Sequence, residues 1–131
     1  MTNHHALAFL LIFIGGGIGS VLRHAVNQAS AAYFGVNFPW GTLSVNIVGS
    51  LAMGLLAGWF AFRGESDQLL RLFLATGILG GFTTFSAFSL DAALLWERGE
   101  MVAAAFYMGG SVAAAVIGVF AGLAVMRTVL A

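Results

Sequence analysis

The chain has 131 residues, of which 60% are hydrophobic and 8% carry a formal charge, with a net charge of zero. A soluble domain carries charge on about a quarter of its residues, so this composition predicts a membrane protein. The five basic residues are all arginines and form no cluster, which excludes the positive surface that nucleic-acid binding needs, and the lack of cysteine excludes disulfides and thiolate sites.

Four apolar segments, each long enough to cross about 30 Å of hydrocarbon, follow one another along the chain. We expect membrane spans at residues 6–28, 41–62, 69–95 and 101–127. They predict an all-α membrane protein made of a single four-helix transmembrane domain, 1–131. A cleaved signal peptide is the competing interpretation of the first segment, but no Lys or Arg precedes the apolar run as such a peptide requires.

Charged residues and tryptophans fall where connections and membrane interfaces should be. The charged residues gather between the second and third spans and around the turn into the fourth: Arg63, Glu65, Asp67, Arg71, Asp91, Glu97, Arg98 and Glu100. Trp40, Trp59 and Trp96 lie near span ends, as interfacial aromatic residues do.

The arginines do not choose an orientation in the membrane. Four spans place Arg63, Arg71 and Arg127 on the side of the two termini, and Arg23 and Arg98 on the other. Orientation follows the imbalance of Lys and Arg between short loops, and three against two is hardly an imbalance. One interpretation is a single orientation with a weak signal. We favour dual topology, with antiparallel pairing of oppositely inserted copies, because four small spans enclose little on their own.

Glycines spaced four residues apart recur in every span. The pairs are Gly15/Gly19, Gly54/Gly58, Gly77/Gly81 and Gly118/Gly122. Such pairs let helix backbones approach closely, either between copies or in the general packing of one chain. The run GGGIGS at 15–20 resembles a phosphate-binding fingerprint, but it lies inside an apolar span with no strand before it, which excludes a dinucleotide site.

The stretch GGFTTFSAFS at 80–89 predicts an interruption of the third span. Non-helical backbone at membrane depth survives only where it is buried or lines a cavity. Carbonyls freed at Gly80 and Thr83 are then able to coordinate a cation. Phe85 and Phe88 share a helix face, and the positive edges of their rings attract anions, although such a pair on an apolar helix more often serves packing.

Other polar residues at membrane depth are also functional candidates. Asn46, in the second span, is able to hydrogen-bond an ion, or a neighbouring helix in a purely structural role. Tyr107 and Ser111 are four apart and share one face of the fourth span. Arg23 lies near the end of the expected first span, where it either snorkels to the interface or gives a pore mouth a positive potential.

These motifs together resemble the CrcB family of fluoride channels, also called Fluc. The resemblance rests on GGFTTFSAFS, on PWGTLSVNIVGS at 39–50 and on GGGIGSVLRH at 15–24, and covers nearly the whole chain. It implies that the protein is an antiparallel, dual-topology homodimer in the bacterial inner membrane and that it is not an enzyme. It also implies two fluoride pores along the subunit interface and a structural sodium ion at the dimer centre.

Carried over residue by residue, the resemblance assigns roles in the fluoride pore. Asn46 matches the asparagine that helps coordinate fluoride. Phe85 and Phe88 match the two phenylalanines whose ring edges line the ion's path. Thr84 and Ser86 lie beside these rings, where a hydroxyl is able to donate to fluoride.

The remaining assignments concern the vestibule, the fourth span and the sodium site. Arg23 matches an arginine near the aqueous vestibule. Tyr107 and Ser111 match the start of a polar track on the fourth span. Gly80 and Thr83 match the residues whose backbone carbonyls hold the central sodium ion.

The sequence departs from the family pattern at three positions. Ala115 stands where the polar track often continues with a serine, which puts that part of the path in doubt. Ala87 replaces a common threonine, and Asp91 stands where glutamate is frequent. None of these changes touches the asparagine, the phenylalanine pair or the glycines.

The sequence thus predicts passive export of cytoplasmic fluoride, which lowers its toxicity. A conducting pore needs weak serial sites, and we expect no basic residue in the central parts of the spans and no coupling carboxylate there.

The alternative, a small four-span proton-coupled multidrug exporter, needs an acidic residue in the first span, which has none. An intramembrane hydrolase needs an activated nucleophile, whereas His4, His5 and His24 lie near span ends.

Overall fold

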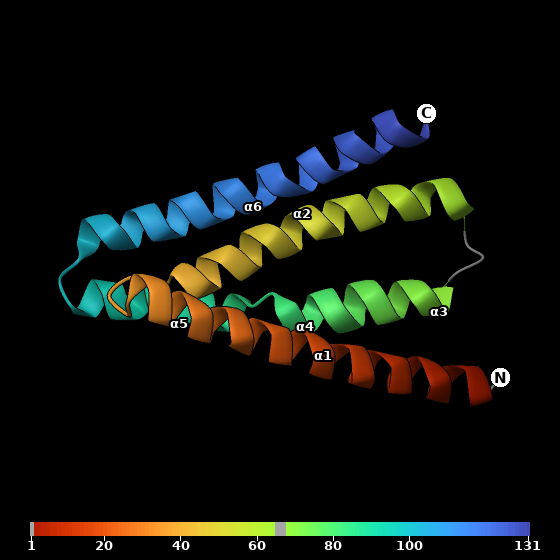
Figure 1. Cartoon of the computed structure of the whole chain (residues 1–131), viewed down its shortest axis with the longest axis horizontal. Coiled ribbons are helices and arrows are strands. Elements are labelled where there is room, and N and C mark those ends of the chain that lie inside the picture. Colours follow the sequence, from red (N-terminus) through yellow and green to blue (C-terminus); the bar gives the residue numbers. More distant parts are fainter. Residues whose placement is uncertain (1, 65–67) are drawn as a thin grey trace.

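The described residues form four helical passes, which run back and forth along the long axis of the molecule (Figure 1). The computed structural model describes residues 2–64 and 68–131, and within these it contains no strand. Each pass is long and apolar enough to cross a membrane, as predicted. In chain order the elements are α1 (Thr2–Phe34), α2 (Trp40–Arg63), α3 (Gln68–Arg71), η2 (a π-helix, Leu72–Leu79), α4 (Gly80–Phe82), α5 (Phe85–Glu97) and α6 (Met101–Leu130).

The connections alternate between the two ends of the bundle. The start of α1, the end of α2, the start of α3 and the end of α6 lie at one end, and the α1–α2 and α5–α6 connections lie at the other (Figure 1). This is the arrangement that four spans require. Glu65 and Asp67, which the sequence assigns to the α2–α3 link, lie outside the described residues.

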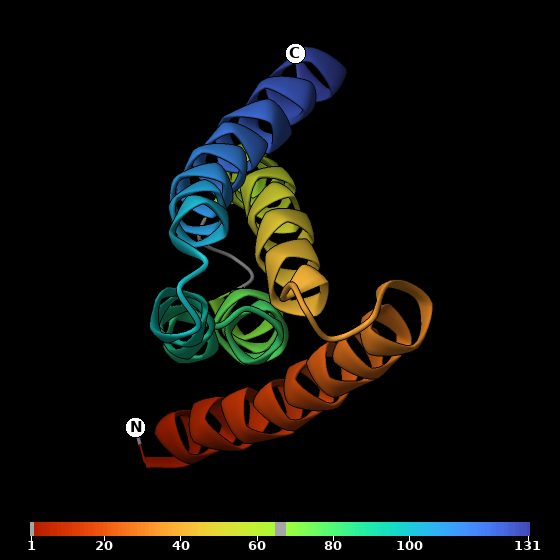
Figure 2. The same cartoon turned by 90° about the vertical axis from the view of Figure 1, so that its left-hand side faces the viewer.

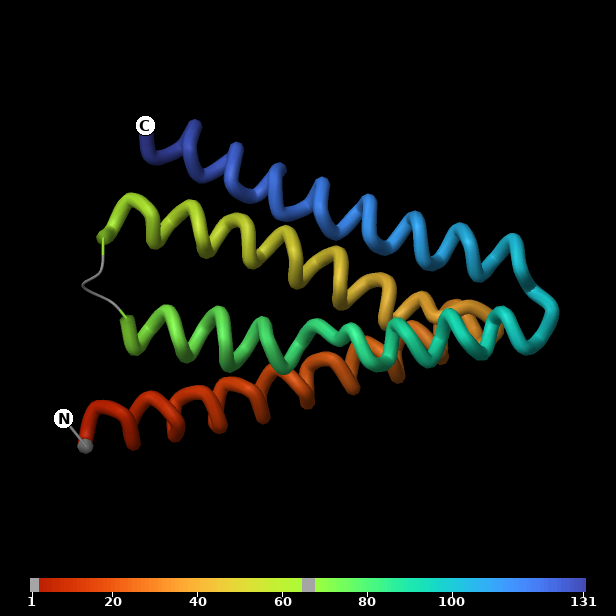
Figure 3. Tube along the Cα trace, turned by 180° about the vertical axis from the view of Figure 1, so that it is seen from behind, coloured from red at the N-terminus to blue at the C-terminus, as the bar shows by residue number. Residues whose placement is uncertain are grey.

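The predicted interruption of the third span is confirmed. Between α4 and α5 the backbone is extended at Thr83 (φ −83°, ψ 159°) and at Thr84 (φ −154°, ψ 125°). The preceding glycines, Gly80 and Gly81, remain helical, so the threonines carry the break. The segments before and after the break follow one another along the molecule, but the end-on view shows that their axes are displaced (Figure 2), and the tube in Figure 3 shows the stretched link between them.

Glycines bring α1 against the half of the third span that precedes the break. A Cβ atom at Gly15 would lie 2.7 Å from the carbonyl oxygen of Phe73, and one at Gly19 would overlap the carbonyl oxygen of Ile78. A Cβ at Gly81 would in turn overlap the backbone of α1. The two backbones are therefore in direct contact, and a side chain at these positions would push α1 away from the broken segment.

Close backbone contacts at glycines also join α2 to α6. A Cβ atom at Gly54 would overlap the carbonyl oxygen of Val119, and one at Gly122 would lie 2.5 Å from the carbonyl oxygen of Leu51. The glycine spacing allows close contacts either between copies or within one chain, and these contacts lie within one chain.

Few side chains are buried within the chain, and many large apolar ones face outward. The buried hydrophobic residues are Val45, Phe60, Ala92, Leu95, Ala104 and Tyr107. Phe9, Phe13, Phe106 and Phe120, among others, are exposed on the helix surfaces. Outward apolar side chains suit a molecule surrounded by lipid hydrocarbon. The small buried cluster formed by Ala92, Leu95, Ala104 and Tyr107 fixes α5 against α6.

Candidate functional site

The side chain of Asn46, on α2, holds the break in the third span. Its Nδ2 donates to the carbonyl oxygen of Thr84 at 3.0 Å, and the backbone N–H of Thr84 donates to its Oδ1 at 2.8 Å. One amide therefore satisfies both backbone groups of an extended residue, where hydrocarbon would leave them unpaired. The sequence left Asn46 with either an ion-binding or a structural role; these two bonds show a structural role, and the ion-binding role stays a prediction.

Hydroxyl groups complete the start of α5. The Oγ1 of Thr84 accepts a hydrogen bond from the N–H of Ala87 at 3.1 Å, as an N-cap residue does, and lies 3.4 Å from the Oγ of Ser86. The hydroxyl of Thr83 donates back to the carbonyl oxygen of Leu79 at 3.0 Å. The N-terminal end of α5, with its partial positive charge, therefore begins at the break.

A polar cavity of about 240 Å³ adjoins the break. The residues that line it are Asn46, Ser50, Thr83, Thr84, Phe85, Phe88, Ser111, Val112 and Ala115. They come from α2, α5, α6 and the link between α4 and α5. Five of the eight residues predicted for the pore meet here, and the other three, Arg23, Ser86 and Tyr107, do not line the cavity. Of the described residues, those that line it carry no formal charge.

The two phenylalanines of α5 behave differently. Their ring centroids are 5.6 Å apart. Phe88 is half-buried and packs on Tyr107, with centroids 5.2 Å apart, whereas Phe85 is 78% exposed within one chain. Packing inside the chain thus accounts for Phe88 but leaves the ring of Phe85 on the open side of the cavity.

Ser111 and Tyr107, on one face of α6, face different surroundings. Ser111 is 4% exposed, and its Oγ has no hydrogen-bond partner among the described residues although it lines the cavity. A buried hydroxyl without a partner is unusual and points to a water or ligand at that place. The hydroxyl of Tyr107 instead donates to Asp91 Oδ2 at 3.0 Å.

Arg23 lies against the break and not at the end of its helix. α1 continues past it to Phe34. Its Nη1 donates to the carbonyl oxygen of Thr83 at 3.3 Å. The helix therefore extends beyond the expected span of 6–28, and the guanidinium of Arg23 reaches a break that lies partway along the third span. It approaches from α1, while Asn46 approaches from α2.

Two carbonyl oxygens at the break have lost their usual helical donor. In an α-helix, the N–H of Thr84 would bond the carbonyl of Gly80, but it donates to Asn46. Likewise, the N–H of Ala87 would bond the carbonyl of Thr83, but it donates to the Thr84 hydroxyl. These are the two carbonyls that the resemblance assigns to sodium. Their freed oxygens fit a hard cation, and Thr83's is shared with Arg23.

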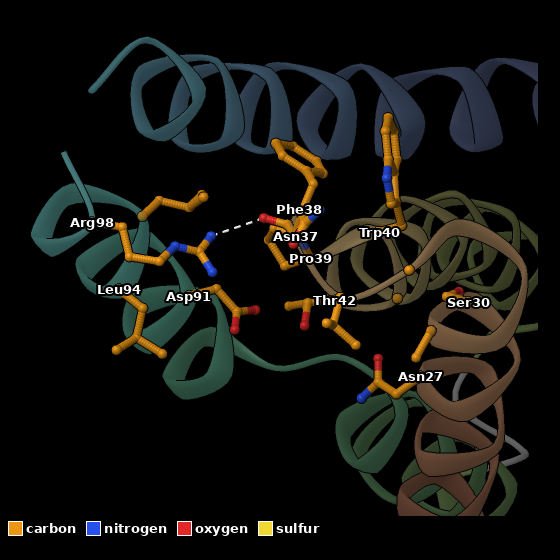
Figure 4. Close-up of a pocket in the computed structure, with 15 residues that line it drawn as sticks. Asn27, Ser30, Asn37, Phe38, Pro39, Trp40, Thr42, Asp91, Leu94 and Arg98 are labelled. Carbon is orange, nitrogen blue, oxygen red and sulfur yellow. Dashed lines mark hydrogen bonds between the residues drawn. The ribbon is translucent and has the colours of Figure 1, made fainter. Parts of the chain in front are cut away.

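A second polar cavity, of about 290 Å³, lies at the α1–α2 connection (Figure 4). Its polar lining residues are Asn27, Ser30, Asn37, Thr42, Asp91 and Arg98. Arg98 Nη2 donates to the carbonyl oxygen of Asn37 at 2.8 Å, and its Nε lies 3.3 Å from Glu100 Oε1. Asp91, which the sequence analysis treated as a charge near the turn into the fourth span and as a departure from the family pattern, lines this cavity and accepts the hydroxyl of Tyr107.

The sequence interpretation missed two polar residues on α2. Thr42 lines the second cavity and Ser50 lines the first, on either side of Asn46. The three residues are spaced by four, so they form one polar stripe along the helix. That spacing was the signal that would have found them.

The fold and the site define a class. An all-helical, multi-pass membrane protein with a broken third helix and a polar cavity at the break belongs with proteins that handle ions at membrane depth. The model of the family described as CrcB-like protein, Camphor Resistance (CrcB), matches residues 10–123, and the chain belongs to this family.

Curated relatives match over nearly their whole lengths. The fluoride-specific ion channel FluC 2 of Nitrobacter hamburgensis is 60% identical over 119 residues, which is 91% of this chain and 96% of the relative. The fluoride-specific ion channel FluC of Methylobacterium nodulans is 64% identical over 118 residues, 90% and 94% of the two chains. That of Rhodopseudomonas palustris is 58% identical over 123 residues, 94% and 99%. These relatives are named as channels and not as enzymes.

Proposed function

We propose that the chain is the subunit of a fluoride-selective passive channel that exports cytoplasmic fluoride and so lowers its toxicity. The observation that carries this proposal is the cavity at the break, which offers hydrogen-bond donors without a formal charge in its lining. One N–H of the Asn46 amide bonds Thr84, so the second remains for an ion, as does the unpartnered hydroxyl of Ser111. The names of the relatives supply fluoride as the ion.

The chemistry suits a small, strongly hydrated anion. Replacing its water requires several donors, whereas a fixed cation in the path would hold the ion too tightly for conduction. Amide, hydroxyl and ring edge each interact modestly, and the partial positive charge at the start of α5 adds to them. Neutral HF crosses membranes and dissociates in a less acidic cytoplasm, so a passive pore is enough to release the trapped anion.

The proposal includes an antiparallel homodimer of oppositely inserted copies. The ring of Phe85 lies exposed on the open side of the cavity, so one chain alone does not enclose a path. A second copy placed against this face would close it. The almost even division of arginines between the two ends of the bundle supports insertion in both orientations.

A structural sodium ion at the dimer centre is also part of the proposal. The carbonyls of Gly80 and Thr83 would hold it, because the bonds at the break divert their helical donors. Bound there, the ion would supply a fixed positive potential near the pore. Two oxygens are few for one cation, and the second copy would contribute the same pair.

The proton-coupled multidrug exporter gains no support. Such an exporter needs a carboxylate in its transport path, and among the described residues that line the break cavity there is none. Asp91 lies in the other cavity and accepts the hydroxyl of Tyr107.

Flux from liposomes tests the proposed function. The purified chain should release fluoride from loaded liposomes without a proton gradient, and chloride far more slowly. Equal rates for the two halides, or transport that stops when the proton gradient is removed, would contradict a fluoride-selective passive pore.

Fixing the orientation tests dual topology. Adding several arginines to both chain ends, which lie on one side, should force a single orientation and abolish flux, because antiparallel pairs no longer form. Co-expression with a copy that carries the extra arginines at the α5–α6 turn should restore it. Normal conduction by the one-way version alone would show that the two orientations are not needed.

A further inference from the structure

The carbonyl oxygen of Thr83 already accepts a hydrogen bond from a charged group. Arg23 reaches it from α1 with an Nη1-to-oxygen distance of 3.3 Å. The proposed sodium site uses the same oxygen, so the inference drawn here rests on that part of the proposed function. It concerns what Arg23 does to a cation held at the break.

The side chain of Arg23 carries a positively charged guanidinium group. Both Arg23 and Thr83 are half-buried, in a part of the molecule where salt screens charges less than at an open surface. A cation bound to the Thr83 carbonyl would share its oxygen atom with the guanidinium of Arg23. Two positive charges so placed repel each other strongly in a poorly polarisable surrounding.

We propose that Arg23 is an internal competitor of the central cation. With the guanidinium on the Thr83 carbonyl, cation binding is weakened, and cation binding in turn loosens the guanidinium. The two effects are equal in size, because linkage between two binding equilibria is reciprocal. Cation occupancy at the break thus decides how firmly Arg23 ties α1 to the link between α4 and α5.

A purely structural role for the same bond makes a different prediction. The break leaves the Thr83 carbonyl without its helical donor, and Arg23 supplies a replacement. If that were its whole role, removing the charge would change stability by the same amount at every sodium concentration. Competition instead makes the sodium dependence itself change.

Thermal unfolding of the full chain in detergent micelles separates the two roles. The midpoint temperature is measured against sodium concentration, with ionic strength held constant by N-methylglucamine chloride, since a ligand of the folded state raises stability by mass action. Arg23→Gln removes the charge and keeps an N–H donor. We expect its half-saturating sodium concentration to fall about tenfold, an effect of the size that one nearby charge produces.

Arg98→Gln is the matched control. Arg98 also donates to the backbone carbonyl of a residue distant in sequence, Asn37, but at the α1–α2 connection. The substitution removes the same charge away from Thr83, so the half-saturating sodium concentration should stay within about twofold of the unsubstituted chain. Arg23→Lys, which keeps the charge, should behave like this control.

The unsubstituted chain gives a second readout that does not depend on how Arg23→Gln folds. With arginine side chains labelled with ¹⁵N, sodium should speed the solvent exchange of one guanidinium group relative to N-methylglucamine. That signal should disappear in Arg23→Lys.

The outcomes separate this inference from the sodium site itself. Tighter sodium binding in Arg23→Gln, or a sodium-loosened Arg23 guanidinium, supports competition. Unchanged or weaker sodium binding in Arg23→Gln, beside a normal sodium response of the unsubstituted chain, overturns competition and leaves the site in place. No sodium response in any variant overturns both, while fluoride flux, measured separately, still tests the channel.

Discussion

The two polar cavities of the chain are similar in volume, about 240 and 290 Å³, and differ in charge. The cavity at the break is lined by an amide, hydroxyls and two phenylalanine rings, whereas the cavity at the α1–α2 connection holds Asp91 and Arg98. A charged side chain costs little free energy at the end of the bundle, where it meets water, and much more at membrane depth. The comparison shows that charged side chains line only the cavity at the end of the bundle, while the groups that line the cavity at the break are neutral.

Asn46→Asp should have the largest effect. The carboxylate has nearly the shape of the amide but cannot donate to Thr84, and it places a negative charge where the anion should pass. We expect fluoride efflux from liposomes to fall at least about 100-fold. Asn27→Asp makes the same chemical change in the end cavity and should leave efflux within about threefold. Equal losses in the two variants would remove the distinction between the cavities.

Replacing the rings should have the next largest effect. Phe85→Ile and Phe88→Ile keep apolar volume and remove the positive ring edge, so efflux should fall about tenfold in each while dimers persist on size-exclusion chromatography. Phe106→Ile is the control. Phe106 lies on α6 and is nearly as exposed as Phe85, at 75% against 78%, so the two substitutions change the apolar surface alike. Unchanged efflux in the Phe85 and Phe88 variants would rule out the ring-edge contribution.

Ser111→Ala should reduce efflux by a smaller factor, about fivefold, because one neutral donor is lost. Its hydroxyl has no partner in the described chain, so the midpoint of thermal unfolding should not fall. Ser44→Ala is the control: that hydroxyl donates to the Trp40 carbonyl of its own helix at 2.7 Å, and efflux should not change. A clear loss of stability in Ser111→Ala would mean that the hydroxyl supports the fold and is not held ready for an ion.

Arg98→Gln should have the smallest effect. Arg98 lines the end cavity and is partly open to solvent, so its charge raises the local anion concentration without holding an ion. Efflux should fall about twofold at low ionic strength and match the unsubstituted chain at high ionic strength, where the charge is screened. A loss that persists in high salt would mean that the bond to Asn37 matters more than the charge.

Local sequence signals were enough to predict the helices and the break. Long apolar runs determine where the four passes lie, and Gly80-Gly81-Thr83-Thr84 marks the interruption because these residues weaken a helix. The sequence marks both the glycines and the threonines, and the structure places the break at the threonines alone. Glycine tolerates a helix when neighbours press against it, and Gly81 lies against the backbone of α1.

The contacts that make the site are distant in sequence and could not be predicted from local signals. Asn46 and Thr84 are 38 residues apart, and Arg23 and Thr83 are 60 apart. A single sequence shows that these polar groups need partners, but not which partners the packing supplies. The resemblance placed Arg23 at a vestibule. The structure adds a contact that the resemblance did not supply, the bond from Arg23 to the carbonyl oxygen of Thr83 at the break.

The π-helical stretch η2 has a consequence for insertions and deletions. Its wide turns contain one residue more than an α-helix would need, as the bond from the N–H of Gly80 to the carbonyl of Ala75 shows. Deleting one residue here would let the wide turns close to α-helical ones, so the segments that follow should keep nearly the same rotation relative to α1. Deleting one residue from an α-helical segment instead would turn everything that follows by about 100°. The π-helical stretch is therefore the part of the third span where a change in length should disturb the contacts of Gly81 and Thr84 least.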